Sequence, residues 1–94
     1  MKIYWTEEAA RDRDAIWNYI AANNPEAALR IDALFTDAAA MLTDFPFAGP
    51  LGKVTGTREL IPHESYRLVY ELYNQTVWIL AIVHTARQWP PPTP

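Results

Sequence analysis

Three β-prone segments near the end of the chain, separated by short polar breaks, place the strongest constraint on the fold. They are residues 57–62 (TRELIP), 65–72 (SYRLVYEL) and 76–84 (TVWILAIVH). The breaks between them, His63-Glu64 and Asn74-Gln75, leave room only for tight turns. Segments joined in this way are typical of β-hairpins. The sequence therefore predicts an antiparallel meander of three strands.

The second break also predicts how the last two strands pair. A two-residue turn there places Tyr70 opposite Ile79 and Leu68 opposite Ala81, which makes one apolar face. The other face would mix apolar and charged side chains, a composition that suits contact with a partner or substrate: Arg67, Val69, Glu71, Trp78, Leu80, Ile82 and His84. A one-residue change in the turn would exchange the two faces.

Two helices are predicted before the meander, after a short β-prone segment at residues 2–5. Thr6 is placed to cap the first helix, with Glu7 at the positive end of its dipole. Asn24 and Pro25 begin the second helix, because proline is tolerated where the first N–H lacks a partner anyway. Apolar residues recur at helical spacing in both, with Arg11, Asp12 and Asp14 mostly off the stripe: Ala9, Ile16 and Ile20, then Ile31, Leu34, Phe35, Ala38, Leu42 and Phe45.

These elements predict the order βααβββ. The fold class is α+β, with a helical hairpin packed on one face of an antiparallel sheet. A loop rich in Pro and Gly, residues 45–56, connects the helices to the meander. A chain of 94 residues is expected to form a single domain, residues 1–94, in which 91–94 are a flexible proline-rich tail.

Composition excludes several classes of protein. The chain has no cysteine, so neither a disulfide framework nor a thiolate metal site is available, and His63 and His84 are its only imidazoles. We find neither a signal-peptide pattern nor an apolar run long enough for a membrane span, which predicts a soluble, cytoplasmic protein. The net charge of −3 argues against a general nucleic-acid binder.

A polar cluster begins at the last residue of the final predicted strand and continues after it: His84, Arg87, Gln88 and Trp89. A charged and aromatic pair on an exposed segment matches the composition of binding hot spots. Structural alternatives stay open, since Trp89 could fold back as a lid on the core and His84 could simply bond a backbone group. Arg67 could likewise pair with Glu59 or Glu71.

Short motifs spread over almost the whole chain carry a further signal when taken together. They are Trp5-Thr6-Glu7, Tyr19-Ile20, Asn24 to Ala28, Phe45-Pro46 with Gly49, Gly56 to Leu60, Ser65 to Tyr70, and His84 to Pro90. Their order and spacing resemble the RelE/ParE superfamily of bacterial toxins. The resemblance implies the toxin of a type II toxin–antitoxin module, held inactive by a co-expressed antitoxin.

The two branches of that superfamily differ in chemistry. RelE-like members cut ribosome-bound messenger RNA without a metal, through attack of a 2′-hydroxyl on the adjacent phosphate. This reaction needs a proton acceptor, cations and an acid. Similarity to RelE implies that Arg67 and Arg87 bind the phosphate, with His84 as a further catalytic candidate. ParE-like members instead bind DNA gyrase and block its cycle, which implies no catalytic residue.

The chain is more similar to the ParE branch. It has Arg58 where RelE-like enzymes generally carry several lysines, and it has no tyrosine in its C-terminal segment. Three successive prolines also exclude a helix there. We therefore expect an inhibitory gyrase binder whose target-binding residues are Arg58, Arg67, His84, Arg87 and Trp89. A RelE-like ribonuclease, and an inactive relative kept for its antitoxin, remain alternatives.

The same resemblance implies the partners. The antitoxin would be ParD-like or another DNA-binding protein, and its segment would cover the helical hairpin and the mixed sheet face. The toxin would then meet DNA only through the antitoxin, and the module could act in plasmid stabilisation. No cofactor, metal or membrane partner is implied.

Overall fold

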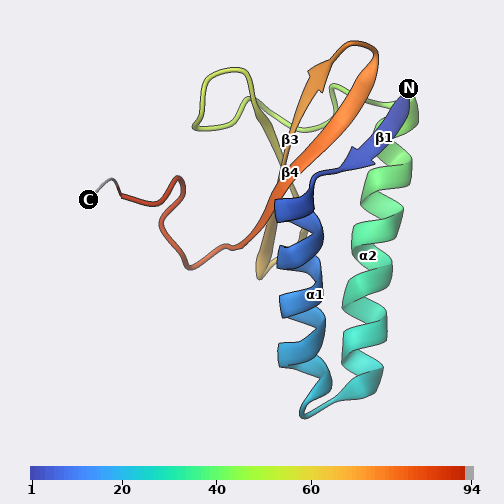
Figure 1. Cartoon of the computed structure of the whole chain (residues 1–94), viewed down its shortest axis with the longest axis vertical. Helices are drawn as coiled ribbons and strands as arrows, with labels where there is room; N and C mark the ends of the chain where they lie inside the picture. Colours follow the sequence, from blue (N-terminus) through green and yellow to red (C-terminus); the bar gives the residue numbers. More distant parts are fainter. Residues whose placement is uncertain (93–94) are drawn as a thin grey trace.

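The computed structural model describes residues 1–92 and confirms the predicted α+β order βααβββ (Figure 1). Its elements are β1 (Lys2–Trp5), α1 (Glu7–Ala21), α2 (Pro25–Asp44), β2 (Arg58–His63), β3 (Tyr66–Tyr73) and β4 (Thr76–His84). Neither helix combines the length and the apolar composition that a membrane crossing requires. Residues 93–94 of the predicted tail lie outside the described residues, so the flexibility of 91–94 stays a prediction, as does the single domain over 1–94.

Local side-chain bonds explain where both helices begin. The Thr6 hydroxyl accepts a hydrogen bond from the Ala9 N–H at 3.2 Å, and the Asn24 side chain accepts one from the Ala27 N–H at 3.1 Å. Both satisfy N–H groups that have no partner inside their helix. The two predicted caps are therefore confirmed, with Pro25 in the first turn of α2.

The sheet has the order β1-β4-β3-β2, and both helices pack against the same face of it. β2, β3 and β4 form the predicted antiparallel meander, whereas β1 lies parallel to β4, which makes the sheet mixed. The turn at Asn74 and Gln75 has positive φ at both residues (52° and 57°), the geometry of a tight hairpin turn. The first turn lies one residue later than predicted, at Glu64-Ser65, because β2 extends to His63.

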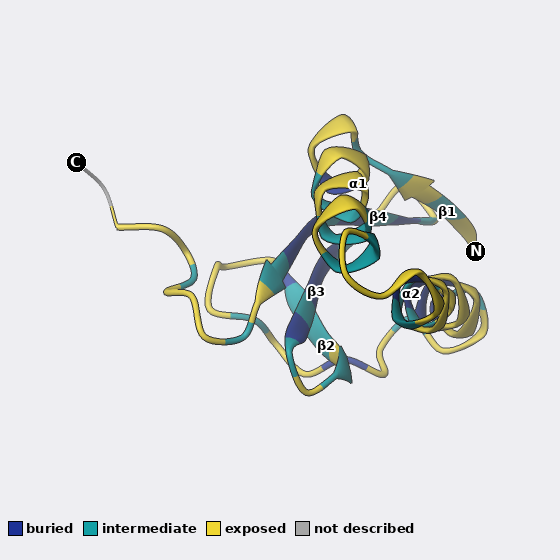
Figure 2. Ribbon diagram, turned by 90° about the horizontal axis from the view of Figure 1, so that it is seen from below, coloured by how far each residue is buried: buried dark blue, intermediate teal, exposed yellow. Residues whose placement is uncertain are grey.

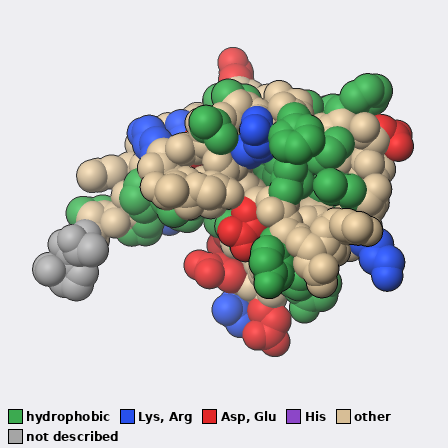
Figure 3. Space-filling model, turned by 90° about the horizontal axis from the view of Figure 1, so that it is seen from above, with side chains coloured by type: hydrophobic (Ala, Val, Ile, Leu, Met, Phe, Trp, Pro, Cys, Tyr) green, Lys and Arg blue, Asp and Glu red, His purple; other side chains and the backbone are tan. Residues whose placement is uncertain are grey.

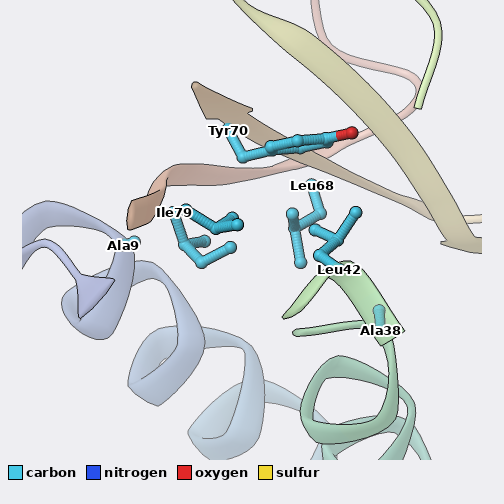
Figure 4. Packing of buried hydrophobic residues seen from close by; sticks show 7 residues of the cluster. Ala9, Ala38, Leu42, Leu68, Tyr70 and Ile79 are labelled. Atoms are coloured by element: carbon cyan, nitrogen blue, oxygen red, sulfur yellow. The ribbon is translucent and has the colours of Figure 1, made fainter. Parts of the chain in front are cut away.

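The core lies between the helices and this face of the sheet. Leu68, Tyr70 and Ile79 from the strands meet Ala9 of α1 and Leu42 of α2, as Figure 4 shows. Burial is concentrated in the strands and in the helix surfaces turned toward them, while the helical turn and the C-terminal segment are exposed (Figure 2). Phe45 does not continue the predicted apolar stripe: it is the C-cap of α2, and its side chain is 64% exposed.

One predicted register is wrong beyond the middle of β4. Tyr70 pairs with Ile79 as predicted, but Val69 pairs with Ala81, which leaves Leu80 as an extra residue in a β-bulge. Leu68 consequently pairs with Ile82 and not with Ala81. The predicted mixed face loses its last two members, Ile82 and His84.

The bulge turns both residues toward the helices. Ile82 is buried with Phe35 and Tyr66, and His84 pairs with Tyr66 across the strands. The two rings of that pair lie 5.6 Å apart. The end of β4 therefore faces α1 and α2.

Candidate functional site

A groove of about 700 Å³ lies between α1, the end of β4 and the C-terminal segment, residues 85–92. α1 contributes an acidic wall with an apolar part: Glu8, Asp12, Ile16 and Tyr19. His84, Arg87 and Trp89 also line the groove, as do Ser65 of the turn before β3 and Tyr66 at the start of β3. The structure thus brings together three of the five predicted target-binding residues.

Beyond the end of β1, side chains at the start of α1 and within it bond to the backbone of β4. β1 pairs with β4 only as far as Ile79. Beyond that point the Thr6 hydroxyl donates to the Ile79 carbonyl at 2.9 Å, and the Asp12 carboxylate accepts from the Ile82 N–H at 3.0 Å. These bonds satisfy backbone groups that a neighbouring strand would otherwise pair. The end of β4 is therefore held by the side chains of Thr6, the N-cap of α1, and of Asp12 within α1.

Burial raises the pKa of Asp12 above its usual range, since desolvation disfavours the charged carboxylate. The bond from the Ile82 N–H and the positive charge of Arg87 act in the opposite direction. Sequence reasoning placed Asp12 mostly off the apolar stripe, which is wrong. It lies three residues after Ala9 and four before Ile16, and this spacing was the available signal that Asp12 faces the sheet.

His84 has the structural role that was left open for it. Its Nδ1 accepts a hydrogen bond from the Ala86 N–H at 3.0 Å, and its carbonyl accepts one from the Arg87 N–H at 2.9 Å. Both bonds form the turn that starts the C-terminal segment. Because Nδ1 is an acceptor here, Nε2 carries the ring proton. His63 makes the equivalent bond with the Ser65 N–H, as expected for a turn residue.

Arg87 and Trp89 form the outer wall of the groove. Arg87 is exposed and makes no ion pair with any residue in the range 1–92. Trp89 is half-buried, and its indole Nε1 is enclosed without an acceptor among those residues. An enclosed donor without a partner costs about 1–3 kcal/mol. Trp89 is therefore partly enclosed at the groove, and its indole N–H has no acceptor among residues 1–92.

Arg67 and Arg58 serve other contacts. Nε of Arg67 lies 3.1 Å from Oε1 of Glu59, and the two side chains are only 15% and 13% exposed. The Arg67 Nε has no aligned hydrogen bond, so the contact is mainly between charges. Nη1 of Arg58 donates to the Gly49 carbonyl at 2.8 Å, and its guanidinium lies 5.0 Å from the Phe47 ring. Neither arginine lines the groove.

The groove offers binding chemistry more readily than bond-breaking chemistry. Its walls carry opposite charges, and an apolar part lies between them. The part of the chain that the structure describes has no cluster of three or more His, Asp or Glu side chains suited to a metal ion. Tyr66 is another lining residue that sequence reasoning did not select. It is buried between Phe35 and His84, and only its distant partners mark it as part of the site.

A family model and two relatives that are described as toxins identify the family. The family model described as the ParE toxin of a type II toxin–antitoxin system, parDE, matches residues 3–89. A putative toxin, Y4kP of Sinorhizobium fredii, is 34% identical over 89 residues, which cover 95% of this chain and 93% of the relative. Toxin RelE2 of Caulobacter vibrioides is 35% identical over 86 residues, covering 92% of this chain and 97% of that toxin.

A solved structure shows the same fold. A chain of the chromosomal ParDE toxin–antitoxin system from P. aeruginosa superposes with a TM-score of 0.78 and 26% sequence identity. The match covers 89% of this chain and 95% of the other. The predicted RelE/ParE resemblance is confirmed, and this chain belongs to the ParE toxin family of type II toxin–antitoxin systems.

Proposed function

We propose that this toxin inhibits DNA gyrase by binding it, without cutting a covalent bond. The observation that carries the proposal is the outer wall of the groove, where Arg87 is exposed and unpaired among the described residues and Trp89 lies beside it. Arginine and tryptophan are the side chains most enriched among binding hot spots. Asp12 holds the end of the preceding strand through its hydrogen bond with the Ile82 N–H.

The ribonuclease alternative is less well supported by the same geometry. It requires a proton acceptor and cations gathered around one phosphate. Arg67 is instead paired with Glu59 outside the groove, and Nδ1 of His84 is occupied by the Ala86 N–H. Of the three residues named for that reaction, Arg87 alone presents an uncommitted charge.

We further propose that a ParD-like, DNA-binding antitoxin neutralises the toxin in the cytoplasm. The family relationship and the ParDE system of the matching structure support this partner. The groove along α1 is a suitable place for an antitoxin segment, because disordered tails can wrap such surfaces. DNA contact and any plasmid stabilisation would then depend on the antitoxin.

The experiment is DNA supercoiling by purified gyrase, with antitoxin-free protein titrated into the reaction. We expect the wild-type toxin to abolish supercoiling by gyrase. Gyrase should keep most of its supercoiling activity in the presence of the double variant Arg87→Ala/Trp89→Ala. Arg30→Ala is the matched control, because Arg30 is an exposed arginine on α2 away from the groove. Ribosomes programmed with messenger RNA form the second arm. Cut message with unaffected gyrase would reject the proposal and favour the RelE-like reaction.

A further inference from the structure

The loop that connects α2 to β2, residues 45–57, is long and firmly anchored. Its backbone packs directly on Tyr70, since a Cβ added at Gly49 would lie 2.9 Å from the Tyr70 ring and 2.8 Å from the Glu59 carbonyl oxygen. The Tyr70 hydroxyl accepts from the Gly49 N–H at 3.0 Å and donates to the Pro46 carbonyl at 2.8 Å. A loop of this length whose secondary structure is a single β-bridge, between Leu51 and Arg58, is commonly a functional one.

Further bonds hold the rest of the loop. The Glu59 N–H donates to the Pro50 carbonyl at 3.0 Å, and the Gly52 N–H donates to the Thr57 carbonyl at 2.8 Å. The Glu59 carboxylate also accepts from the Lys53 backbone N–H at 3.1 Å. The loop backbone is therefore fixed along most of its length.

This fixed loop directs its large apolar side chains outward. Phe47 is 68% exposed, Leu51 is 77% exposed and Val54 is 37% exposed. A loop anchored only for stability would turn such side chains toward the core, because burial of an apolar side chain is favourable. Exposed apolar groups on a rigid support are instead typical of an interaction surface.

The charge of the loop is opposite to that of the whole chain. Lys53, the one charged residue of the loop, is exposed. Next to the loop, at the start of β2, Arg58 lies against Phe47 and the Glu59 carboxylate faces Arg67. The net charge of the chain is −3. Figure 3 shows the end of the molecule to which the loop belongs, where Lys or Arg side chains lie among hydrophobic ones.

The loop also lies on the same side of the molecule as the C-terminal segment. In Figure 1 the yellow-green part of the loop, around residues 51–56, and the segment that follows β4 project to the same side of the sheet. Arg87 adds a third cation to this side of the molecule. One large partner could therefore contact both elements.

We propose that the loop is a second contact surface for the toxin's protein target, and that it takes a region of the target carrying acidic and apolar side chains. The inference rests on the proposed function, because it assigns a further surface to the same target. Leu51 and Val54 would supply apolar contact, while Lys53 and Arg58 would meet the acidic groups.

The test compares two exposed leucines. Leu51→Asp changes the loop, and Leu29→Asp is the matched control on α2, where Leu29 is 62% exposed. Both variants are assayed for gyrase inhibition and for growth arrest on induction. We expect Leu51→Asp to need at least ten times more protein for half-inhibition and to lose growth arrest, with Leu29→Asp unchanged. Lys53→Glu should weaken gyrase inhibition and growth arrest less than Leu51→Asp does. Lys2→Glu is the control for this variant.

Antitoxin binding and thermal melting of each variant show whether it is folded. Equal potency of Leu51→Asp and Leu29→Asp overturns the inference, and so does a Leu51→Asp variant that loses antitoxin binding while it stays toxic. A wild-type dimer that Leu51→Asp dissociates would assign the loop to self-association and would overturn the inference as well.

If the wild type arrests growth without affecting gyrase, the proposed function fails, while the growth readout still decides whether the loop contacts the target. A wild type that does neither overturns both proposals.

Discussion

The loop 45–57 and the C-terminal segment 85–92 both present side chains at the surface, but they are held in different ways. Buried hydrogen bonds to Tyr70 and packing at Gly49 tie the loop to the core. The C-terminal segment is joined to the fold by the turn at His84 and by Trp89, whose indole N–H lacks an acceptor among residues 1–92. The loop is therefore preorganised for contact. In the C-terminal segment, the enclosed indole N–H of Trp89 lowers the stability of the observed conformation.

The largest expected effect tests the anchoring of the loop. Tyr70→Phe leaves the buried Gly49 N–H and the Pro46 carbonyl without their partner, so we expect a loss of about 1–3 kcal/mol in the free energy of unfolding. Chemical denaturation measures this loss, and amide exchange should rise within residues 46–57. Tyr73→Phe is the control, because Tyr73 is 69% exposed. Equal stability of the two variants would mean that the loop is not held by Tyr70.

A smaller effect tests the seat of Trp89. Trp89→Phe keeps an aromatic ring and removes the unpaired donor, so we expect stability to stay equal to that of the wild type or to rise by up to about 1 kcal/mol. Trp78→Phe is the contrasting variant, since Trp78 Nε1 donates to the Tyr73 carbonyl at 3.0 Å and its loss should cost about 0.5–1.5 kcal/mol. If Trp89→Phe costs more than Trp78→Phe, the indole N–H has a partner that stabilises the segment in solution.

The smallest effect tests the support of β4 through pH. Burial raises the pKa of Asp12 in the folded chain, so the folded state binds its proton more tightly than the unfolded state does. Ionisation of Asp12 therefore lowers stability as the pH rises above the ordinary carboxyl value of 3.8, and this penalty is fully present above the raised folded pKa.

Asp12→Asn should remove that pH dependence, because its side-chain oxygen can still accept from Ile82 without ionising. We expect the variant to gain stability relative to the wild type between pH 4 and pH 7, as urea unfolding would show. Asp14→Asn, which changes an exposed carboxyl of the same helix, should leave the profile unaltered. An unchanged profile for Asp12→Asn as well would refute the buried environment of Asp12.

Much of the fold was predictable because its signals are local. Thr6 and Asn24 cap the helices a few residues along, and Asn74-Gln75 forms the predicted tight turn. The register beyond the bulge was not predictable, since nothing near Leu80 in the sequence shows that β4 contains one residue more than β3 across it. The predicted faces of Ile82 and His84 were wrong for the same reason.

The candidate site was likewise predictable only in part. The cluster of His84, Arg87 and Trp89 could be selected from their position after a strand, and the structure gathers them at one groove. Arg58 and Arg67 were also selected. The fold of the loop gives Arg58 its partner Gly49, whereas the pairing of β2 with β3 gives Arg67 its partner Glu59, one of the two partners that the sequence left open. Asp12 was missed because it bonds to a residue 70 positions away.

By itself, the sequence determined the kind of each element, their order and the family, because capping, turn chemistry and the spacing of apolar residues act over a few neighbours. Only the tertiary structure decided which arginines form an ion pair within residues 1–92, that Asp12 bonds the end of β4, and that the loop 45–57 directs its apolar side chains outward. Those outcomes depend on contacts between residues far apart in the chain, where a single bulge in β4 reverses the faces of all that follows.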